Sequence, residues 1–105
     1  YSISCAALDQ MTRSMAVEMA PYRVRVNGVG FGSGMSAFLK DILKAQPDYR
    51  KEIEAHTPLG RIAGPDALTE TVQFLASDAS GFMTGQVLTV DGGRTLLDPV
   101  AAPAH

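Results

Sequence analysis

Two short β-branched runs, separated by segments with a helical pattern, most constrain the fold of this sequence. The runs cover Tyr22 to Val29 and Gln86 to Val90, and both have the composition of strands. A helix between two strands is the connection that parallel neighbours need, whereas a hairpin joins antiparallel ones. The order helix, strand, flap helices, helix, strand therefore predicts an α/β fold with two parallel neighbouring strands.

The helical segments are marked by apolar periodicity and by proline at helix starts. We expect helices over the ranges Ser2–Ala20, Ser36–Ala45, Pro47–His56 and Pro65–Ser77. In the first range, apolar side chains recur every three or four residues, at Leu8, Met11, Met15 and Met19. This spacing predicts one buried helical stripe.

Length and composition exclude several classes of protein. With 105 residues, 46% apolar and 19% charged, the chain is expected to form one packed domain at most rather than a disordered linker. A net charge of −2 with interspersed signs gives no basis for nucleic-acid binding or for attraction to an anionic membrane. No apolar run approaches the roughly 18 residues that a membrane-spanning helix needs.

Cysteine and histidine usage gives two further expectations. Cys5 is the only cysteine, so no internal disulfide can form, and a reducing, cytoplasmic location is predicted. His56 and His105 do not have metal-ligand spacing with cysteine or carboxylate pairs, so no metal site is expected.

A glycine-rich loop follows the first predicted strand. Gly30, Gly32 and Gly34 alternate with Phe31 and Ser33. Glycine permits positive φ angles and lets backbone approach a neighbour or a ligand closely. The loop is therefore a candidate binding element, although turn formation alone explains the glycines equally well.

Five landmarks in fitting order give the sequence a family resemblance. They are Tyr1–Leu8, Arg25-Val26-Asn27, Pro58-Leu59-Gly60-Arg61, Phe74–Asp78, and Thr84-Gly85-Gln86 continuing to Val90-Asp91-Gly92-Gly93. Together they resemble the C-terminal half of a short-chain dehydrogenase/reductase. The resemblance implies the C-terminal portion of a Rossmann-like parallel sheet over residues 1–93, with residues 94–105 as a C-terminal tail.

The resemblance assigns catalytic positions to the first helix. The family signature is Tyr-x-x-x-Lys, and this chain has Tyr1 and Cys5 at those positions. By resemblance, Tyr1 is the general acid/base that gives or takes the hydroxyl proton during hydride transfer. The family lysine lowers the pKa of the tyrosine and binds the nicotinamide ribose, and a neutral cysteine does neither.

The resemblance also assigns cofactor-binding positions to Phe31, Gly32, Gly34 and Ser36 in the glycine-rich loop. Gly32 matches the family pattern and Ser36 keeps its hydroxyl. Phe31 stands in place of a proline and Gly34 in place of an aliphatic residue, so the loop is expected to be less rigid. The flap from Ser36 to His56 corresponds to the family's variable substrate-binding region.

Two functions remain open at this point. The first is hydride transfer between NAD or NADP and a small alcohol or carbonyl substrate, by an incomplete or degenerate copy of the enzyme. It is incomplete because the glycine-rich dinucleotide fingerprint and the catalytic serine and asparagine of the family's first half have no counterpart in this sequence. The alternative is a non-catalytic interaction or structural module that keeps the family's association surfaces. Both predict a homo-oligomer.

Overall fold

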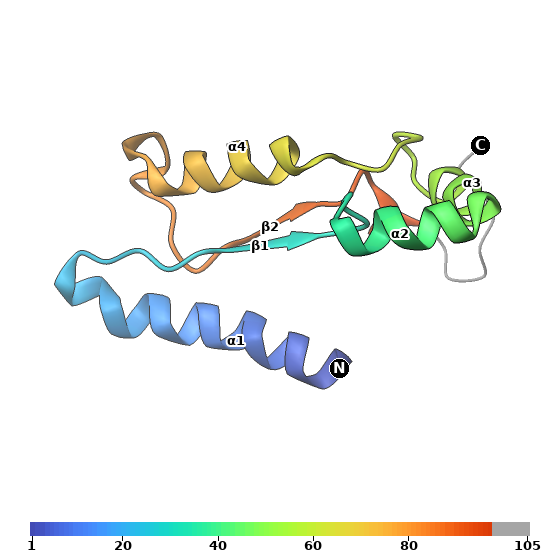
Figure 1. The fold of residues 1–105 in the computed structure, drawn as a ribbon. Coiled ribbons are helices and arrows are strands. Elements are labelled where there is room, and N and C mark those ends of the chain that lie inside the picture. The colour runs from blue at the N-terminus through green and yellow to red at the C-terminus, as the bar shows by residue number, and fades with distance from the viewer. Residues whose placement is uncertain (98–105) are drawn as a thin grey trace. The chain divides into compact units, whose positions relative to one another are not determined.

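The computed structural model describes residues 1–97; the end of the predicted tail, residues 98–105, lies outside the described part. The helices and strands are α1 Ser2–Met19, β1 Gly28–Phe31, α2 Ala37–Ala45, α3 Pro47–Ala55, α4 Pro65–Ala76 and β2 Val87–Val90 (Figure 1). Short 3-10 turns cover Ala20–Tyr22, Asp78–Ser80 and Arg94–Leu96. All four predicted helices are confirmed to within a residue at either end.

The chain forms two compact units. Among the described residues, the first unit comprises residues 1–30 and 70–89, and the second comprises residues 31–69 and 90–97. None of the helices in the described part of the chain is both long enough and apolar enough to cross a membrane.

β1 and β2 are neighbours in a two-stranded sheet. The Gly85 N–H donates to the Val26 carbonyl at 2.7 Å, and the Gly28 N–H donates to the Gln86 carbonyl at 2.8 Å. Since the paired positions advance in the same direction along both segments, the strands are parallel. The predicted parallel arrangement is confirmed.

The first strand begins later than the sequence predicts. We expected it over residues 22–29, but β1 covers Gly28–Phe31. Arg23 lies in the left-handed region at φ 59°, which interrupts an extended chain. The Val26 N–H then bonds to the side-chain oxygen of Thr84 at 3.1 Å instead of a strand carbonyl. Side-chain contacts therefore replace part of the regular ladder ahead of Gly28.

The buried face of α1 also differs from the predicted stripe. The stripe residues Leu8, Met11 and Met15 are 57%, 50% and 42% exposed, and the two buried residues of α1 are Thr12 and Ala16. A Cβ on Gly28 would lie 3.7 Å from the Thr12 hydroxyl, and one on Gly85 would lie 3.4 Å from the Ala16 methyl. The helix therefore packs through small residues on Gly28, the first residue of β1, and on Gly85, just before β2. Of the predicted stripe only Met19 is half-buried, and the other three residues stay exposed.

The Arg25 side chain joins the end of α4 to the segment before β2. Its Nη1 donates to the Ser80 carbonyl at 2.8 Å, the Ser80 hydroxyl at 3.0 Å and the Met83 carbonyl at 3.2 Å. Its Nη2 donates to the carbonyls of Leu75 at 3.0 Å and Ser77 at 3.2 Å. The guanidinium thus satisfies carbonyls at the C-terminal end of α4, where a positive charge is also favoured by the helix dipole.

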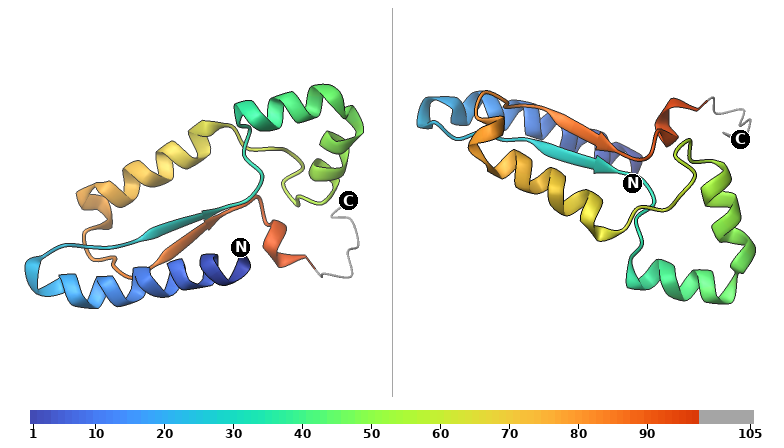
Figure 2. Two further views of the ribbon diagram at one scale, coloured as in Figure 1. Left: turned by 60° about the horizontal axis from the view of Figure 1, so that its bottom comes forward. Right: turned by 90° about the horizontal axis from the view of Figure 1, so that it is seen from above.

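In the second unit, α2 and α3 form a helical pair that meets at Gln46 (Figure 2). The Ser36 hydroxyl caps α2 by accepting from the Leu39 N–H at 3.1 Å. Leu43 and Ile53 from the two helices are buried with Ile62, and this cluster is the hydrophobic core of the unit.

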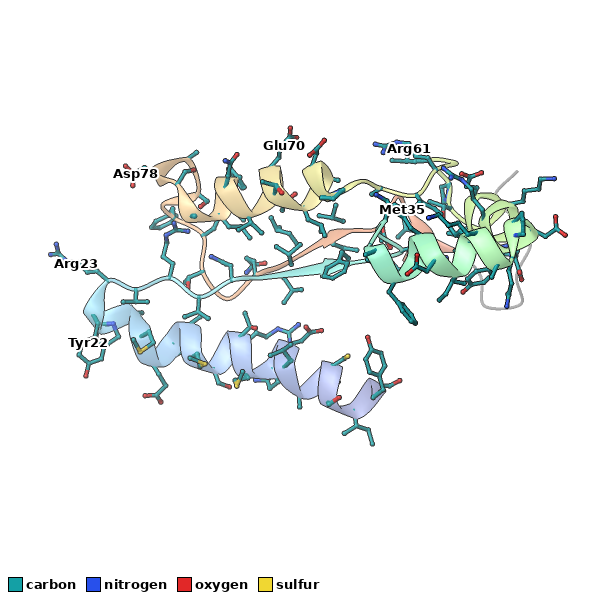
Figure 3. The ribbon with its side chains drawn as sticks, in the orientation of Figure 1. Tyr22, Arg23, Met35, Arg61, Glu70 and Asp78 are labelled. Atoms are coloured by element: carbon teal, nitrogen blue, oxygen red, sulfur yellow. The ribbon has the colours of Figure 1, made fainter. Side chains whose placement is uncertain are left out.

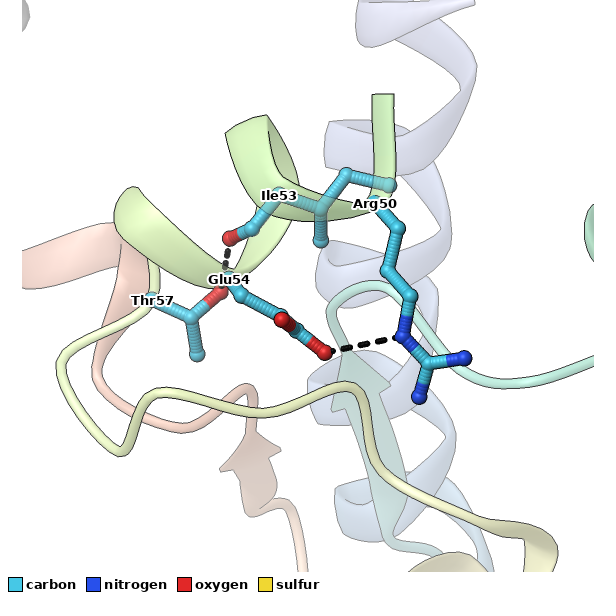
Figure 4. Close-up of polar contacts among 4 residues, drawn as sticks. All are labelled: Arg50, Ile53, Glu54 and Thr57. Carbon is cyan, nitrogen blue, oxygen red and sulfur yellow. Dashed lines mark hydrogen bonds and ion pairs between the residues drawn. The ribbon is translucent and has the colours of Figure 1, made fainter. Parts of the chain in front are cut away.

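The loop after α3 is closed onto the turn after β2. The Thr57 hydroxyl donates to the Ile53 carbonyl at 2.7 Å (Figure 4). The Leu59 N–H donates to the Gly92 carbonyl at 3.1 Å. The second bond holds the two landmark sequences around Leu59 and Gly92 side by side.

Asp91 organises the turn that follows β2. Its carboxylate accepts from the Gly93 N–H at 2.8 Å and from the Thr95 N–H at 2.8 Å. Hydrogen bonds from the Thr95 side chain and backbone, followed by the Gly93 N–H, lower the pKa of the Asp91 carboxyl. The first residues of the predicted tail, Arg94–Leu96, are therefore held in a 3-10 turn.

We predict that Asp91→Ala destabilises the chain by about 1 kcal/mol near neutral pH, the usual cost of replacing a capping aspartate by alanine. Because folding lowers the pKa of Asp91, its stabilising effect is present above the unfolded-state value and is lost as the pH falls through the folded-state value. Urea unfolding at several pH values should show the difference between the two proteins shrinking in acid. Asp41→Ala, at an exposed position of α2, should show no comparable loss. A difference that persists in strong acid would contradict the assignment.

Candidate functional site

The glycine-rich loop passes directly over the start of the turn after β2. The Gly32 N–H donates to the Val90 carbonyl at 3.2 Å. A Cβ on Gly32 would lie 3.1 Å from the Asp91 Cβ and 3.3 Å from the Asp91 Cα, so a side chain there would crowd the backbone. In contrast, a Cβ on Gly34 would meet nothing within 4 Å. Gly32 is therefore needed for close packing, whereas Gly34 borders open space.

The remaining loop positions differ in the contacts that they make. Phe31 is 63% exposed. The Met35 N–H donates to the Ala63 carbonyl at 2.8 Å, which anchors the C-terminal end of the loop. The Ser36 oxygen accepts from the Leu39 N–H as the cap of α2, so the Ser36 O–H proton is the group left for another partner.

A small cavity of about 90 Å³ lies beside the loop, entirely within the second unit. Its lining includes Ser33 from the loop, Arg61 from the segment before α4, and Asp91 from the turn after β2. Arg94 donates to the Ser33 hydroxyl at 3.3 Å. The segments around Arg61 and Asp91 are sequence landmarks that carried no predicted site. The loop brings them together, because Gly32 bonds to Val90 and Met35 bonds to Ala63.

Tyr1 and Cys5 lie one turn apart at the start of α1, as the spacing of four predicts. The Cys5 N–H donates to the Tyr1 carbonyl at 3.0 Å, and both side chains are exposed. Hydrogen bonding with the Cys5 side chain, and then the charge of its thiolate, raise the pKa of the Tyr1 phenol above its ordinary value. Cys5 therefore disfavours the phenolate, whereas an ammonium at this position would favour it.

The predicted site residues thus fall in two different units of the structure. Tyr1 and Cys5 belong to the first unit, and Phe31, Gly32, Gly34 and Ser36 belong to the second. Among residues 1–97 no group of three or more histidine, cysteine, aspartate or glutamate side chains is arranged to hold a metal ion.

We predict that the pKa of Tyr1 falls in the order wild type, Cys5→Ala, Cys5→Lys. Alanine removes the hydrogen bond and the thiolate charge, and lysine adds an opposite charge one helical turn away. Tyrosinate absorbance against pH measures this in a Tyr22→Phe, Tyr49→Phe background, where Tyr1 is the only remaining tyrosine. If Tyr1 titrates with the same pKa in Cys5→Ala as in the wild type, the thiol does not perturb Tyr1.

Comparisons with known proteins cover almost the whole chain. The family model described as enoyl-(acyl carrier protein) reductase matches residues 1–95. Cis-4-hydroxycyclohexanecarboxylate dehydrogenase of Sinomonas cyclohexanicum is 39% identical over 95 residues, covering 90% of this chain and 37% of that protein. The 4-formylbenzenesulfonate dehydrogenase of Comamonas testosteroni is 39% identical over 98 residues, covering 91% of this chain and 39% of that protein.

A solved structure gives the same picture. The crystal structure of a short chain dehydrogenase family protein from Francisella tularensis matches 92% of this chain and 43% of its own chain, with a TM-score of 0.82 and 37% identity. The chain thus spans roughly two fifths of the length of the relatives it matches.

Proposed function

Because this chain belongs to the short-chain dehydrogenase/reductase family, we propose that it carries the tyrosine position and the nicotinamide-facing loop of an NAD(P)-dependent oxidoreductase. The proposed substrate is a small alcohol or carbonyl compound. The observation that carries the proposal is the loop from Phe31 to Ser36, whose backbone conformation leaves open space at one of the positions that the family uses for its cofactor.

The loop residues fit such a cofactor. Gly34 has no atom within 4 Å of where a Cβ would stand, so a planar ring can approach its backbone. The Ser36 oxygen is fixed by its bond to the Leu39 N–H, and its proton is available to a polar group of the cofactor. NAD(P), when bound, supplies or accepts the hydride, and this segment would contact and orient its nicotinamide end.

The Tyr1–Cys5 pair fits the chemistry less well. Tyr1 would give or take the hydroxyl proton of the substrate, a task that needs a phenolate for oxidation. An ordinary phenol is only about one part in a thousand ionised at pH 7, and Cys5 raises the pKa of Tyr1 further. The thiol also does not supply the positive charge that the family uses to hold the ribose. Cys5 therefore weakens both the proton transfer and the cofactor contact.

The names of two relatives support the substrate class. One acts on a hydroxyl compound, cis-4-hydroxycyclohexanecarboxylate, and the other on an aldehyde, 4-formylbenzenesulfonate. Both are small ring compounds with an alcohol or carbonyl group, the class proposed for this chain.

The raised pKa of Tyr1 also favours a second candidate function, a non-catalytic module that associates through its exposed helix. The apolar stripe on α1, with Leu8, Met11 and Met15 all at least 42% exposed, is a surface that soluble proteins normally cover. Under either function we propose a homo-oligomer. Light scattering at micromolar concentration tests this, and a monomer would contradict it.

Amide proton–nitrogen correlation spectra of the labelled chain test the loop assignment. NADH at millimolar concentration should shift the amide signals of Phe31 to Ser36, and ADP-ribose, which has no nicotinamide ring, should leave them unchanged. Equal shifts with both ligands would show that the loop does not face the nicotinamide. No shift with either would favour the non-catalytic module.

We predict that the purified 105-residue chain consumes no measurable NAD(P)H with small ketones or aldehydes. Its sequence has no counterpart of the family's dinucleotide fingerprint. Positioning of two reactants is worth about 7–11 kcal/mol, so a cofactor that is held weakly, by the loop alone, loses most of the rate. For the same reason Cys5→Lys alone should leave this chain inactive. Turnover that disappears in Tyr1→Phe would contradict the prediction.

A further inference from the structure

A second pocket lies between α2 and α3, with a volume of about 300 Å³. It is separate from the cavity beside the glycine-rich loop and shares no lining residue with it. The lining consists of an apolar group and a cationic group: Met35, Leu43 and Pro47, and Lys40, Lys44 and Arg50. Its volume is within the range of about 300–1,000 Å³ that is usual for small-molecule sites.

The apolar part of this pocket is continuous with the core of the second unit. Leu43 is 9% exposed and belongs to the core cluster, and Met35 packs against that cluster. Met35 lies just ahead of α2, at the N-terminal end of that helix (Figure 3). A ligand in this pocket would therefore place an apolar body against a surface that the core holds in position.

The charged part of the pocket is positive only. Lys40 and Lys44 are four residues apart on α2, so their ammonium groups lie on the same side of the helix. Like charges at this spacing destabilise a helix, unless an anion lies between them. Within residues 1–97 neither lysine forms an ion pair with a carboxylate, and no acidic side chain lines the pocket.

Arg50 adds a third cation from α3. Its Nε donates to the Glu54 carboxylate at 3.0 Å, and its two terminal nitrogens point away from that carboxylate (Figure 4). Glu54 offsets part of the Arg50 charge, so the two lysines supply most of the net positive charge of the pocket.

We propose that this pocket binds a small carboxylate with an apolar body, with Lys40 and Lys44 pairing with the anionic group and Met35, Leu43 and Pro47 contacting the body. The pocket lies in the flap, entirely within the second unit, and the proposed binding site does not depend on where Tyr1 lies. Binding itself requires neither cofactor nor turnover, so it is tested without them.

Binding of 3-phenylpropionate, followed by the same correlation spectra, tests the pocket. The shifts should be concentrated on α2 and the start of α3. The neutral 3-phenylpropionamide tests the charge, and acetate tests the apolar body. Both should bind about fivefold more weakly, since the amide loses the ion pairs with the lysines and acetate loses the contacts of a partly buried ring. Added salt should weaken the binding of the carboxylate but not the binding of the amide.

Substitutions at exposed lysines separate this pocket from general attraction to positive charge. Lys40→Gln and Lys44→Gln should each weaken 3-phenylpropionate binding about two- to fivefold, and the double variant about tenfold. Lys51→Gln removes an exposed lysine from α3 that does not line the pocket, and it should have no effect. Circular dichroism checks that each variant is folded.

Three outcomes would overturn the proposal: no binding at millimolar 3-phenylpropionate, equal affinity for the amide, or an equal effect of Lys51→Gln. None of them bears on the loop assignment, which NADH and ADP-ribose test separately. A failed loop test combined with lysine-dependent carboxylate binding would overturn the oxidoreductase and leave the pocket as a binding site.

Discussion

Replacing Arg25 with alanine is expected to lower the free energy of unfolding by about 3 kcal/mol, which corresponds to a fall in Tm of roughly 10–20 °C. The guanidinium donates to the four carbonyls of Leu75, Ser77, Ser80 and Met83 and to one hydroxyl. Alanine leaves these acceptors without their donor at a partly buried position, and such groups are costly when unsatisfied. Thermal and urea unfolding followed by circular dichroism measure the loss.

Two controls separate the hydrogen-bond network from the loss of a positive charge. Arg25→Lys keeps the charge, but an ammonium cannot reproduce the planar fork of the guanidinium, so about half of the loss should remain. Arg23→Ala removes an arginine whose side chain points away from α4 (Figure 3) and whose guanidinium makes no hydrogen bond within the described residues. It should change stability by less than about 0.5 kcal/mol. Equal effects of Arg23→Ala and Arg25→Ala would contradict the assignment.

Replacing Gly92 with alanine is expected to destabilise the chain by about 3 kcal/mol. Gly92 lies at φ +66°, where a side chain costs about 1–2 kcal/mol. An added Cβ would also stand 2.7 Å from the Thr57 methyl, which cannot easily move because Thr57 is 5% exposed and its hydroxyl is bonded to the Ile53 carbonyl. The turn and the loop after α3 would have to separate. Urea unfolding measures the change.

The two causes can be separated with Thr57→Ser, which removes the methyl and keeps the hydroxyl. In that background Gly92→Ala should cost only the backbone part, about 1–2 kcal/mol. Gly64→Ala, where an added Cβ meets nothing within 4 Å, should be neutral or slightly stabilising. An unchanged cost in the Thr57→Ser background would show that the contact with Thr57 is not the cause.

Helix positions and the parallel pairing could be read from the sequence because local signals carry them. Pro47 and Pro65 begin α3 and α4 where proline is preorganised, and Ser36 caps α2 as a short polar residue does before a helix. The pairing of β1 with β2 follows from the helix between them. The family could also be recognised from the sequence, because its landmarks are short segments with distinctive residues.

The candidate site could be predicted from the sequence only in part. The sequence placed Tyr1 and Cys5 one helical turn apart, and it identified the loop that contains Gly32 and Gly34. Spacing alone did not show that Cys5 raises the pKa of Tyr1, or that Gly32 packs on Asp91 while Gly34 borders open space. These properties depend on which atoms lie within a few ångströms, so they require the folded structure.

By itself, then, the sequence determined which segments become helices, that the strands are parallel, and which family the chain belongs to. The tertiary structure decided that α1 is buried through Thr12 and Ala16, while Leu8, Met11 and Met15 stay exposed, and that β1 begins only at Gly28. It also decided that Arg25 bonds to Ser80, 55 residues away. Capping and periodicity act between near neighbours, whereas these outcomes depend on glycine positions and carbonyls that distant segments bring together.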